Sequence, residues 1–305
     1  MSASPQANER LTRAIHSLHG LSCGDAFGER FFLHPEVAQS LIAQRAIPSK
    51  PWRYTDDTAM AIGITETLEE FEEVQAERLA ENFGKRFVAD PYRGYGAAMH
   101  SLLPELAANP GHWRQLAPQL FKGNGSFGNG AAMRVAPLGA YFADDLNILI
   151  QQAELSASIT HSHPEGVAGA IAVALAAGLA WRHKNTPIRA QQFLEQIGER
   201  IPESEVARRI AKARDLDDHT TVEKAVAILG SGAEVSAQDT VPFCLWVAAH
   251  RLSSYEDALW TTVSGLGDRD TTCAIVGGIV AISAGFDRIP KSWLASREPL
   301  PLWFL

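Results

Sequence analysis

Two short acidic segments carry the residue types best suited to chemistry. Residues 55–58 are "TDDT" and residues 268–271 are "DRDT", and each runs directly into an apolar stretch rich in small residues. Asp and Thr at a helix start cap free backbone N–H groups and suit the helix dipole, which is the alternative explanation for either segment alone. A cap needs only one carboxylate, however, and each segment holds two. Buried like charges are costly unless a proton or a cation lies between them, so the pair of segments predicts a cation site.

The ligand types indicate the class of cation. Neither segment contains His or Cys. A set of roughly five or six carboxylate and hydroxyl oxygens suits a hard cation, so we expect Mg²⁺ or Mn²⁺ rather than Zn²⁺. Two segments would suit two ions about 3.5–4 Å apart that share one carboxylate. Arg269, between the two aspartates of the second segment, either turns outward or pairs with one of them.

The elements that must position these segments are helices. Apolar residues recur at a three-to-four spacing near the N-terminus, and helical patterns that follow capping residues recur along the chain. Alternating strand patterns bounded by turns are scarce. The sequence therefore predicts one all-α domain over residues 1–305. The segments expected to be helical are 9–28, 55–74, 147–160, 164–181, 188–201, 204–216, 239–252, 254–267 and 271–284.

The charge balance and the apolar runs exclude some classes of protein. The 305-residue chain carries a formal net charge of −8, which argues against a nucleic-acid or anionic-membrane surface. Its longest apolar run, residues 166–181, is shorter than the roughly 18 residues of a membrane span, so we expect a buried helix there. Three isolated cysteines and a polar N-terminus without a signal segment favour a cytoplasmic protein. We expect a monomer with neither membrane nor nucleic-acid partners.

Two glycine-containing loops are the candidates for ligand contact. They span residues 89–101 and 121–139, and the second contains five glycines. Glycines at this density mark tight turns or a close approach of the backbone to a ligand. A flexible surface loop is the alternative for either one.

Five segments, taken together and in order, resemble the ADP-ribosylglycohydrolase family, which includes the ADP-ribosylarginine hydrolases and the dinitrogenase-reductase-activating glycohydrolases. The segments are "GLSCGDAFGE", "YTDDTAMA", "RGYGAAM", "SFGNGAAMRVAPLG" with the later "SITHSHPEGVAGA", and "GLGDRDTTCAIVGGI". The resemblance implies an orthogonal bundle of many helices. It also implies a glycosidase-type hydrolase that acts on N- or O-glycosidic bonds of ADP-ribose.

The same resemblance implies a set of site residues. Two Mg²⁺ or Mn²⁺ ions would be held by Thr55, Asp56, Asp57, Asp268, Asp270 and Thr271, with Asp270 as the bridging ligand. The expected substrate contacts are Gly94, Gly96, Ser126, Phe127, Gly128, Asn129, Gly130, Met133 and His161. Phe127 or Tyr95 would stack on adenine. The alternative for His161 is a structural histidine, and His163, which precedes a proline, is expected to be structural.

Hydrolysis of such a bond passes through an oxocarbenium-like state and needs a carboxylate as general base. The candidate catalytic residues are Asp56, Asp57 and Glu29. Phe32 stands where the family commonly has a glutamate, and Glu29 is considered because it could reach the pocket from a shortened turn. Its alternative is an exposed loop glutamate. Asp25 is expected to cap or brace this turn. Leu266 and Arg269 depart from the family pattern in the last segment.

The expected substrate is an ADP-ribosylated protein, with an arginine linkage favoured. A serine linkage, a nucleotide base and small molecules such as O-acetyl-ADP-ribose are alternatives. A non-catalytic binding or structural member of the family is a further alternative, although both acidic segments are retained. A di-metal phosphohydrolase is disfavoured because such sites usually include histidine ligands.

Overall fold

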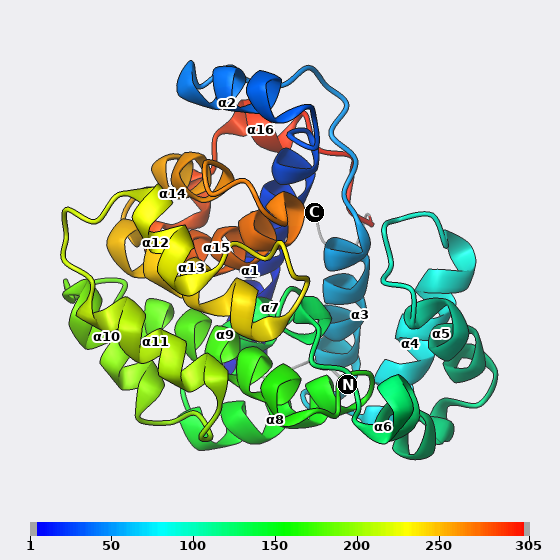
Figure 1. Cartoon of the computed structure of the whole chain (residues 1–305). Helices are drawn as coiled ribbons and strands as arrows, with labels where there is room; N and C mark the ends of the chain where they lie inside the picture. The colour runs from blue at the N-terminus through cyan, green and yellow to red at the C-terminus, as the bar shows by residue number, and fades with distance from the viewer. Residues whose placement is uncertain (1–4, 302–305) are drawn as a thin grey trace.

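Helices account for all the regular structure in the described part of the chain, residues 5–301 of a computed structural model (Figure 1). Residues 5–301 contain no strand, which confirms the predicted all-α class. The α-helices are α1 Pro5–Glu29, α2 Pro35–Ala43, α3 Asp56–Phe71, α4 Ala76–Ala89, α5 Met99–Ala108, α6 Trp113–Gly123, α7 Ala136–Tyr141, α8 Leu146–Ser158, α9 Pro164–Arg182, α10 Ala190–Gly198, α11 Glu205–Asp215, α12 Val222–Leu229, α13 Ala237–Arg251, α14 Tyr255–Val263, α15 Arg269–Ala284 and α16 Lys291–Leu294. Three short 3-10 helices complete the set: η1 Pro110–His112, η2 Asn129–Ala131 and η3 Phe286–Arg288.

The pairing of α1 with α15 is the closest helix contact around the site. Gly20, Gly24 and Gly28 recur every four residues and therefore share one face of α1. A Cβ atom on Gly24 would lie 2.1 Å from the carbonyl oxygen of Cys273, and one on Gly28 would lie 2.1 Å from that of Arg269. Only glycine permits this approach of the two backbones. The contact brings the C-terminal half of α1 against the first turn of α15, where the second acidic segment lies.

An aromatic cluster holds the segment that precedes α3 against the C-terminal end of α1. Phe27 stacks on Trp293 at a centroid distance of 4.5 Å and meets Trp260 edge-on at 5.0 Å. Trp52 joins the cluster, and its backbone N–H donates to the carbonyl of Ser296. Because Trp52 is held here, the first acidic segment at the start of α3 also lies beside α1.

Helix α9 lies among the other helices in the lower half of Figure 1, and it accounts for the longest apolar run. By length and hydropathy it is the single helix in residues 5–301 that could span a membrane, but 78% of that window is buried inside the protein. The run is therefore a buried core helix, as predicted. The glycine-containing segment 121–139 is only partly loop, because η2 and the start of α7 lie within it.

Candidate active site

The carboxylate of Asp25 braces the start of α3. It is fully buried on α1 and accepts hydrogen bonds from the backbone N–H and the hydroxyl of both Thr55 and Thr58. The donor–acceptor distances lie between 2.5 and 3.1 Å. The prediction that Asp25 caps or braces its own turn is wrong, because its hydrogen-bond partners lie at the start of α3.

Three carboxylates from three helices converge beside this brace. One oxygen from each of Asp25, Asp57 and Asp270 lies within 4.8 Å of the other two. The hydroxyl of Thr55 lies 2.9 Å from Asp25 Oδ1 and 3.0 Å from Asp57 Oδ2, yet it has one proton to donate. Oδ1 of Asp57 is buried and has no hydrogen-bond partner within residues 5–301. Hard cations take such unpartnered carboxylate oxygens, so the cluster fits Mg²⁺ or Mn²⁺.

The second acidic segment is held by the glycine loop. Asp268 Oδ2 accepts a hydrogen bond of 2.8 Å from the side-chain amide of Asn129, and Asp270 Oδ1 accepts one from the backbone N–H of Thr271. Arg269 forms no ion pair with a described carboxylate; its guanidinium lies 5.1 Å from the centroid of the Phe32 ring. Arg269 therefore turns away from Asp268 and Asp270 and pairs with neither.

The electrostatics of the cluster favour a bound cation. Burial, and next the Asp25 carboxylate, raise the pKa of Asp56 to about 8. Burial also raises the pKa of Asp25 to about 6, even though the hydrogen bonds from Thr58 and Thr55 lower it. The pKa values of Asp57 and Asp270 lie well above the usual range, because both are buried beside other carboxylates. Such a cluster takes up protons or cations in place of the water it has lost.

A cavity of about 570 Å³ joins the carboxylates to the glycine loop. Nearly all the residues predicted for the site line it. They are Asp56, Asp57, Gly94, Gly96, Ser126, Phe127, Gly128, Asn129, Gly130, Met133, His161, Asp268, Asp270 and Thr271. The cavity is therefore a single site with a carboxylate end and a glycine-loop end.

The imidazole of His161 lies against the glycine loop. A Cβ atom on Gly130 would lie 2.9 Å from His161 Nε2, and one on Gly128 would lie 3.3 Å from it. Gly128 also donates its backbone N–H to the hydroxyl of Ser126. Because Gly128 and Gly130 have no side chains, the loop backbone can lie directly against the His161 ring in the cavity wall.

Exposed apolar side chains that the sequence did not single out line the mouth of the cavity. Phe121 is 54% exposed and Val235 is 58% exposed, and both have a φ of 51°, in the left-handed region. The Phe121 and Phe127 rings are 6.3 Å apart. Glu234 lines the same edge. No sequence pattern marks Phe121 and Val235, because they meet only through the fold.

Some predicted residues lie outside the cavity lining. Thr55 is buried behind the carboxylates, and Glu29 is exposed at the last turn of α1. Tyr95 is buried with its ring edge-on to Phe87, so Phe127 is the better placed of the two for stacking. His163 caps α9 by accepting the backbone N–H of Glu165, as expected of a structural residue.

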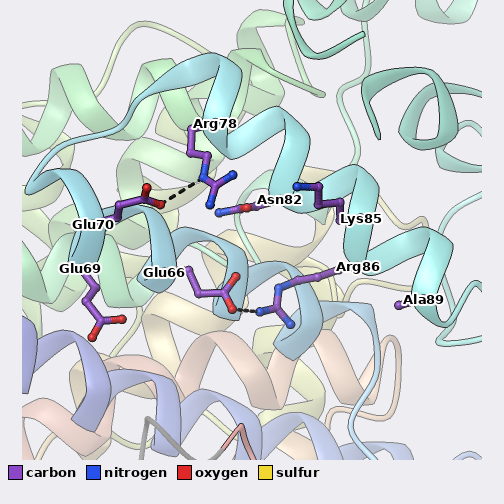
Figure 2. Close-up of a pocket in the computed structure, with 8 residues that line it drawn as sticks. All are labelled: Glu66, Glu69, Glu70, Arg78, Asn82, Lys85, Arg86 and Ala89. Atoms are coloured by element: carbon purple, nitrogen blue, oxygen red, sulfur yellow. Dashed lines mark hydrogen bonds and ion pairs between the residues drawn. The ribbon is translucent and has the colours of Figure 1, made fainter. Parts of the chain in front are cut away.

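A second hollow lies between α3 and α4, and Figure 2 shows its lining. Arg78 pairs with Glu70, and Arg86 pairs with Glu66. Lys85 pairs with Glu81 at its edge. Each of these basic side chains thus pairs with a neighbouring glutamate, and this hollow serves the packing of α4 on α3.

Comparisons with known proteins find similar proteins over nearly the whole length of this chain. The family model described as ADP-ribosylglycohydrolase matches residues 6–302. The human "ADP-ribosylhydrolase ARH3" is 30% identical over 339 aligned residues, with 96% of this chain and 91% of that protein covered. The "ADP-ribosyl-[dinitrogen reductase] glycohydrolase" of Rhodospirillum rubrum is 26% identical, with 94% and 90% covered. A solved structure, titled "ADP-ribosylglycohydrolase-related protein complex", shares the fold with a TM-score of 0.64 at 22% identity, covering 95% of this chain and 94% of that chain.

Proposed function

This chain belongs to the ADP-ribosylglycohydrolase family, and we propose that it is a metal-dependent hydrolase that removes ADP-ribose from a modified protein side chain or a small molecule. The observation that carries the proposal is the single cavity that joins a buried carboxylate cluster to a glycine loop. A ligand with a sugar at one end and a diphosphate beside it matches these two ends. ADP-ribose is such a ligand.

The carboxylate end would hold two Mg²⁺ or Mn²⁺ ions. The proposed ligands are Thr55, Asp56, Asp57, Asp268, Asp270 and Thr271. Bound ions of this type orient sugar hydroxyls and lower the pKa of a coordinated water. Asp25 holds Thr55 in place, and Asn129 holds Asp268 in place, so both positions depend on a neighbouring side chain.

The remaining chemistry falls to side chains of the cavity wall. The carboxylates of Asp56 and Asp57 are the candidates to take the proton from the attacking water. The backbone N–H groups of the loop around Gly128 would position the diphosphate, since closely spaced amides form an anion-binding nest. The ring of Phe127, at the mouth of the cavity, would stack on the adenine ring of ADP-ribose. Glu29 remains a predicted base: burial raises its pKa, the charge of Arg30 lowers it and that of Asp268 raises it, but Glu29 lies outside the cavity lining, which gives it less support than the two aspartates.

The linkage is a separate proposal. The arginine linkage is the first candidate, from the resemblance of the sequence segments. An oxygen linkage to serine, a nucleotide base and small molecules such as O-acetyl-ADP-ribose are the alternatives.

A panel of ADP-ribosylated substrates tests the proposal. The purified protein is incubated with Mg²⁺ and with peptides carrying arginine-linked or serine-linked ADP-ribose, an ADP-ribosylated base, or O-acetyl-ADP-ribose. Release of free ADP-ribose from at least one substrate is the expected result, and the fastest arm identifies the linkage. Binding of ADP-ribose without release from any arm would favour the non-catalytic alternative instead.

A further inference from the structure

Arg134 is buried at the centre of the molecule with no task in the proposed reaction. It is fully buried, and no described carboxylate lies within ion-pair distance of its guanidinium. Nη2 donates to the carbonyl of Ser156 at 3.1 Å and to the hydroxyl of Thr160 at 2.8 Å. Burial lowers the pKa of Arg134 to about 9, although the charge of Asp56 opposes this shift. The rest of the guanidinium packs on Met60 and Phe83. A buried charge without a directly paired carboxylate is costly, so its hydrogen bonds to Ser156 and Thr160 point to a specific role.

The hydroxyl of Thr160 has two polar neighbours. One is Nη2 of Arg134, which can only donate, and the other is Nδ1 of His161, at 2.7 Å. Thr160 is fully buried, and its oxygen donates to no carbonyl within residues 5–301. Because Nδ1 is the one acceptor among the described residues for this buried hydroxyl proton, which would otherwise be left without a partner, the proton is directed to Nδ1. Nδ1 then accepts, and the proton of the neutral ring lies on Nε2.

The Nε2 atom of His161 faces the cavity. It lies beneath Gly128 and Gly130, and no atom in the described chain accepts a hydrogen bond from it. The side chain itself is 5% exposed. Burial, and next the charge of Arg134, lower the pKa of His161 to about 3, so the ring is neutral at ordinary pH. It therefore offers one donor to the cavity and no positive charge.

We propose that Arg134 and Thr160 are positioning residues that hold His161 in the tautomer protonated on Nε2, so that it donates a hydrogen bond to an oxygen of the substrate. The identity of that substrate rests on the proposed function. His161 acts as a fixed, uncharged donor to a phosphate or ribose oxygen and takes no proton from water. The chain from Arg134 through Thr160 to His161 is thus one directed hydrogen-bond relay.

The tautomer is measured without a ligand. Protein labelled with ¹⁵N in its histidines is examined by long-range ¹H–¹⁵N correlation NMR, and the His161 signals are those missing from the His161→Asn spectrum. We expect a pyridine-type Nδ1 and a pyrrole-type Nε2. A proton on Nδ1, or an even mixture of tautomers, in the unmodified protein would overturn the proposal.

Two substitutions at Thr160 test its role. Thr160→Val removes the hydroxyl and keeps the shape, so the ring should become a mixture of tautomers and the Kd for ADP-ribose should rise about tenfold. Thr160→Ser, the matched control, restores the hydroxyl and should retain both the tautomer and the affinity. If Thr160→Val changes neither one, Thr160 does not position His161.

The same measurements separate this inference from the proposed function. If the unmodified protein does not bind ADP-ribose at all, the proposed function fails, whereas the spectrum still decides the tautomer. If ADP-ribose binds but His161 carries its proton on Nδ1, the relay fails and the proposed function stands.

Discussion

The carboxylate of Asp25 accepts hydrogen bonds from both the backbone N–H and the hydroxyl of Thr55, at 3.0 and 2.9 Å. The two residues are thirty positions apart in the chain, Asp25 on α1 and Thr55 at the N-cap of α3. Thr55 also caps α3 and touches Asp57, so the contact fixes the first turn of α3 where the carboxylates converge. Metal ligands are commonly oriented by such neighbouring groups. Asp25 thus controls the geometry of the cluster.

Asp25→Asn should weaken both the fold and the metal site. An amide turns one oxygen into a donor that faces the N–H groups of Thr55 and Thr58, so we expect a loss of about 2–4 kcal/mol in the free energy of unfolding. Metal affinity should fall about 10-fold to 100-fold. Asp145→Asn is the matched control, because Asp145 caps α8 far from the cluster in sequence and Asn serves equally as a cap. Urea unfolding and calorimetry measure both effects; equal losses in the two variants would contradict the assignment.

Without divalent ions, the protein should lose stability as the pH rises. Burial raises the pKa values of Asp56 to about 8 and of Asp25 to about 6, above their ordinary value of 3.8. The folded state therefore holds more protons than the unfolded state, and stability falls from about pH 4 to about pH 8. Cations replace those protons, so Mg²⁺ should raise Tm more at pH 8 than at pH 5.5. A Tm that Mg²⁺ leaves unchanged at pH 8 would argue against a buried metal site.

Replacing a carboxylate by an amide should lower the rate of ADP-ribose release much more at Asp270 than at Glu29. Asp270→Asn removes a charge from the proposed bridge between two ions, and we expect ADP-ribose release to fall about 100-fold or more. Glu29→Gln makes the same chemical change at an exposed position outside the cavity lining, so its rate should stay within about threefold. Initial rates with saturating Mg²⁺ measure both. A large loss in Glu29→Gln would instead identify Glu29 as the general base.

The glycine loop should affect ADP-ribose binding more than metal binding. A Cβ atom on Gly130 would lie 2.9 Å from the His161 ring, so Gly130→Ala should raise the Kd for ADP-ribose about tenfold or more. Mg²⁺ affinity should change less, because the loop touches the metal site only through the hydrogen bond from Asn129 to Asp268. Gly198→Ala is the matched control, since a Cβ atom there meets nothing within 4 Å. Calorimetry with each ligand decides; unchanged ADP-ribose affinity in Gly130→Ala would show that the loop does not hold the ligand.

Local chemistry in the sequence predicted the two acidic segments, because paired carboxylates before an apolar helix are unusual in the linear chain. It could not predict that Asp25 would meet Asp57 and Asp270, since that meeting depends on the close approach of α1 and α15 at Gly24 and Gly28. Two residues at the mouth of the cavity could not be predicted for the same reason. Phe121 and Val235 lie 114 positions apart, and only tertiary packing makes them line one edge.

The rate of ADP-ribose release before and after removal of divalent ions shows whether hydrolysis depends on a bound metal. The intact protein is assayed on the best substrate of the panel with Mg²⁺, then after treatment with EDTA, and again after Mg²⁺ or Mn²⁺ is returned. Release should stop with EDTA and recover with the metal, because we propose that the buried carboxylates at one end of the cavity hold the ions that act on the ribose. An undiminished rate in metal-free protein would contradict this metal dependence.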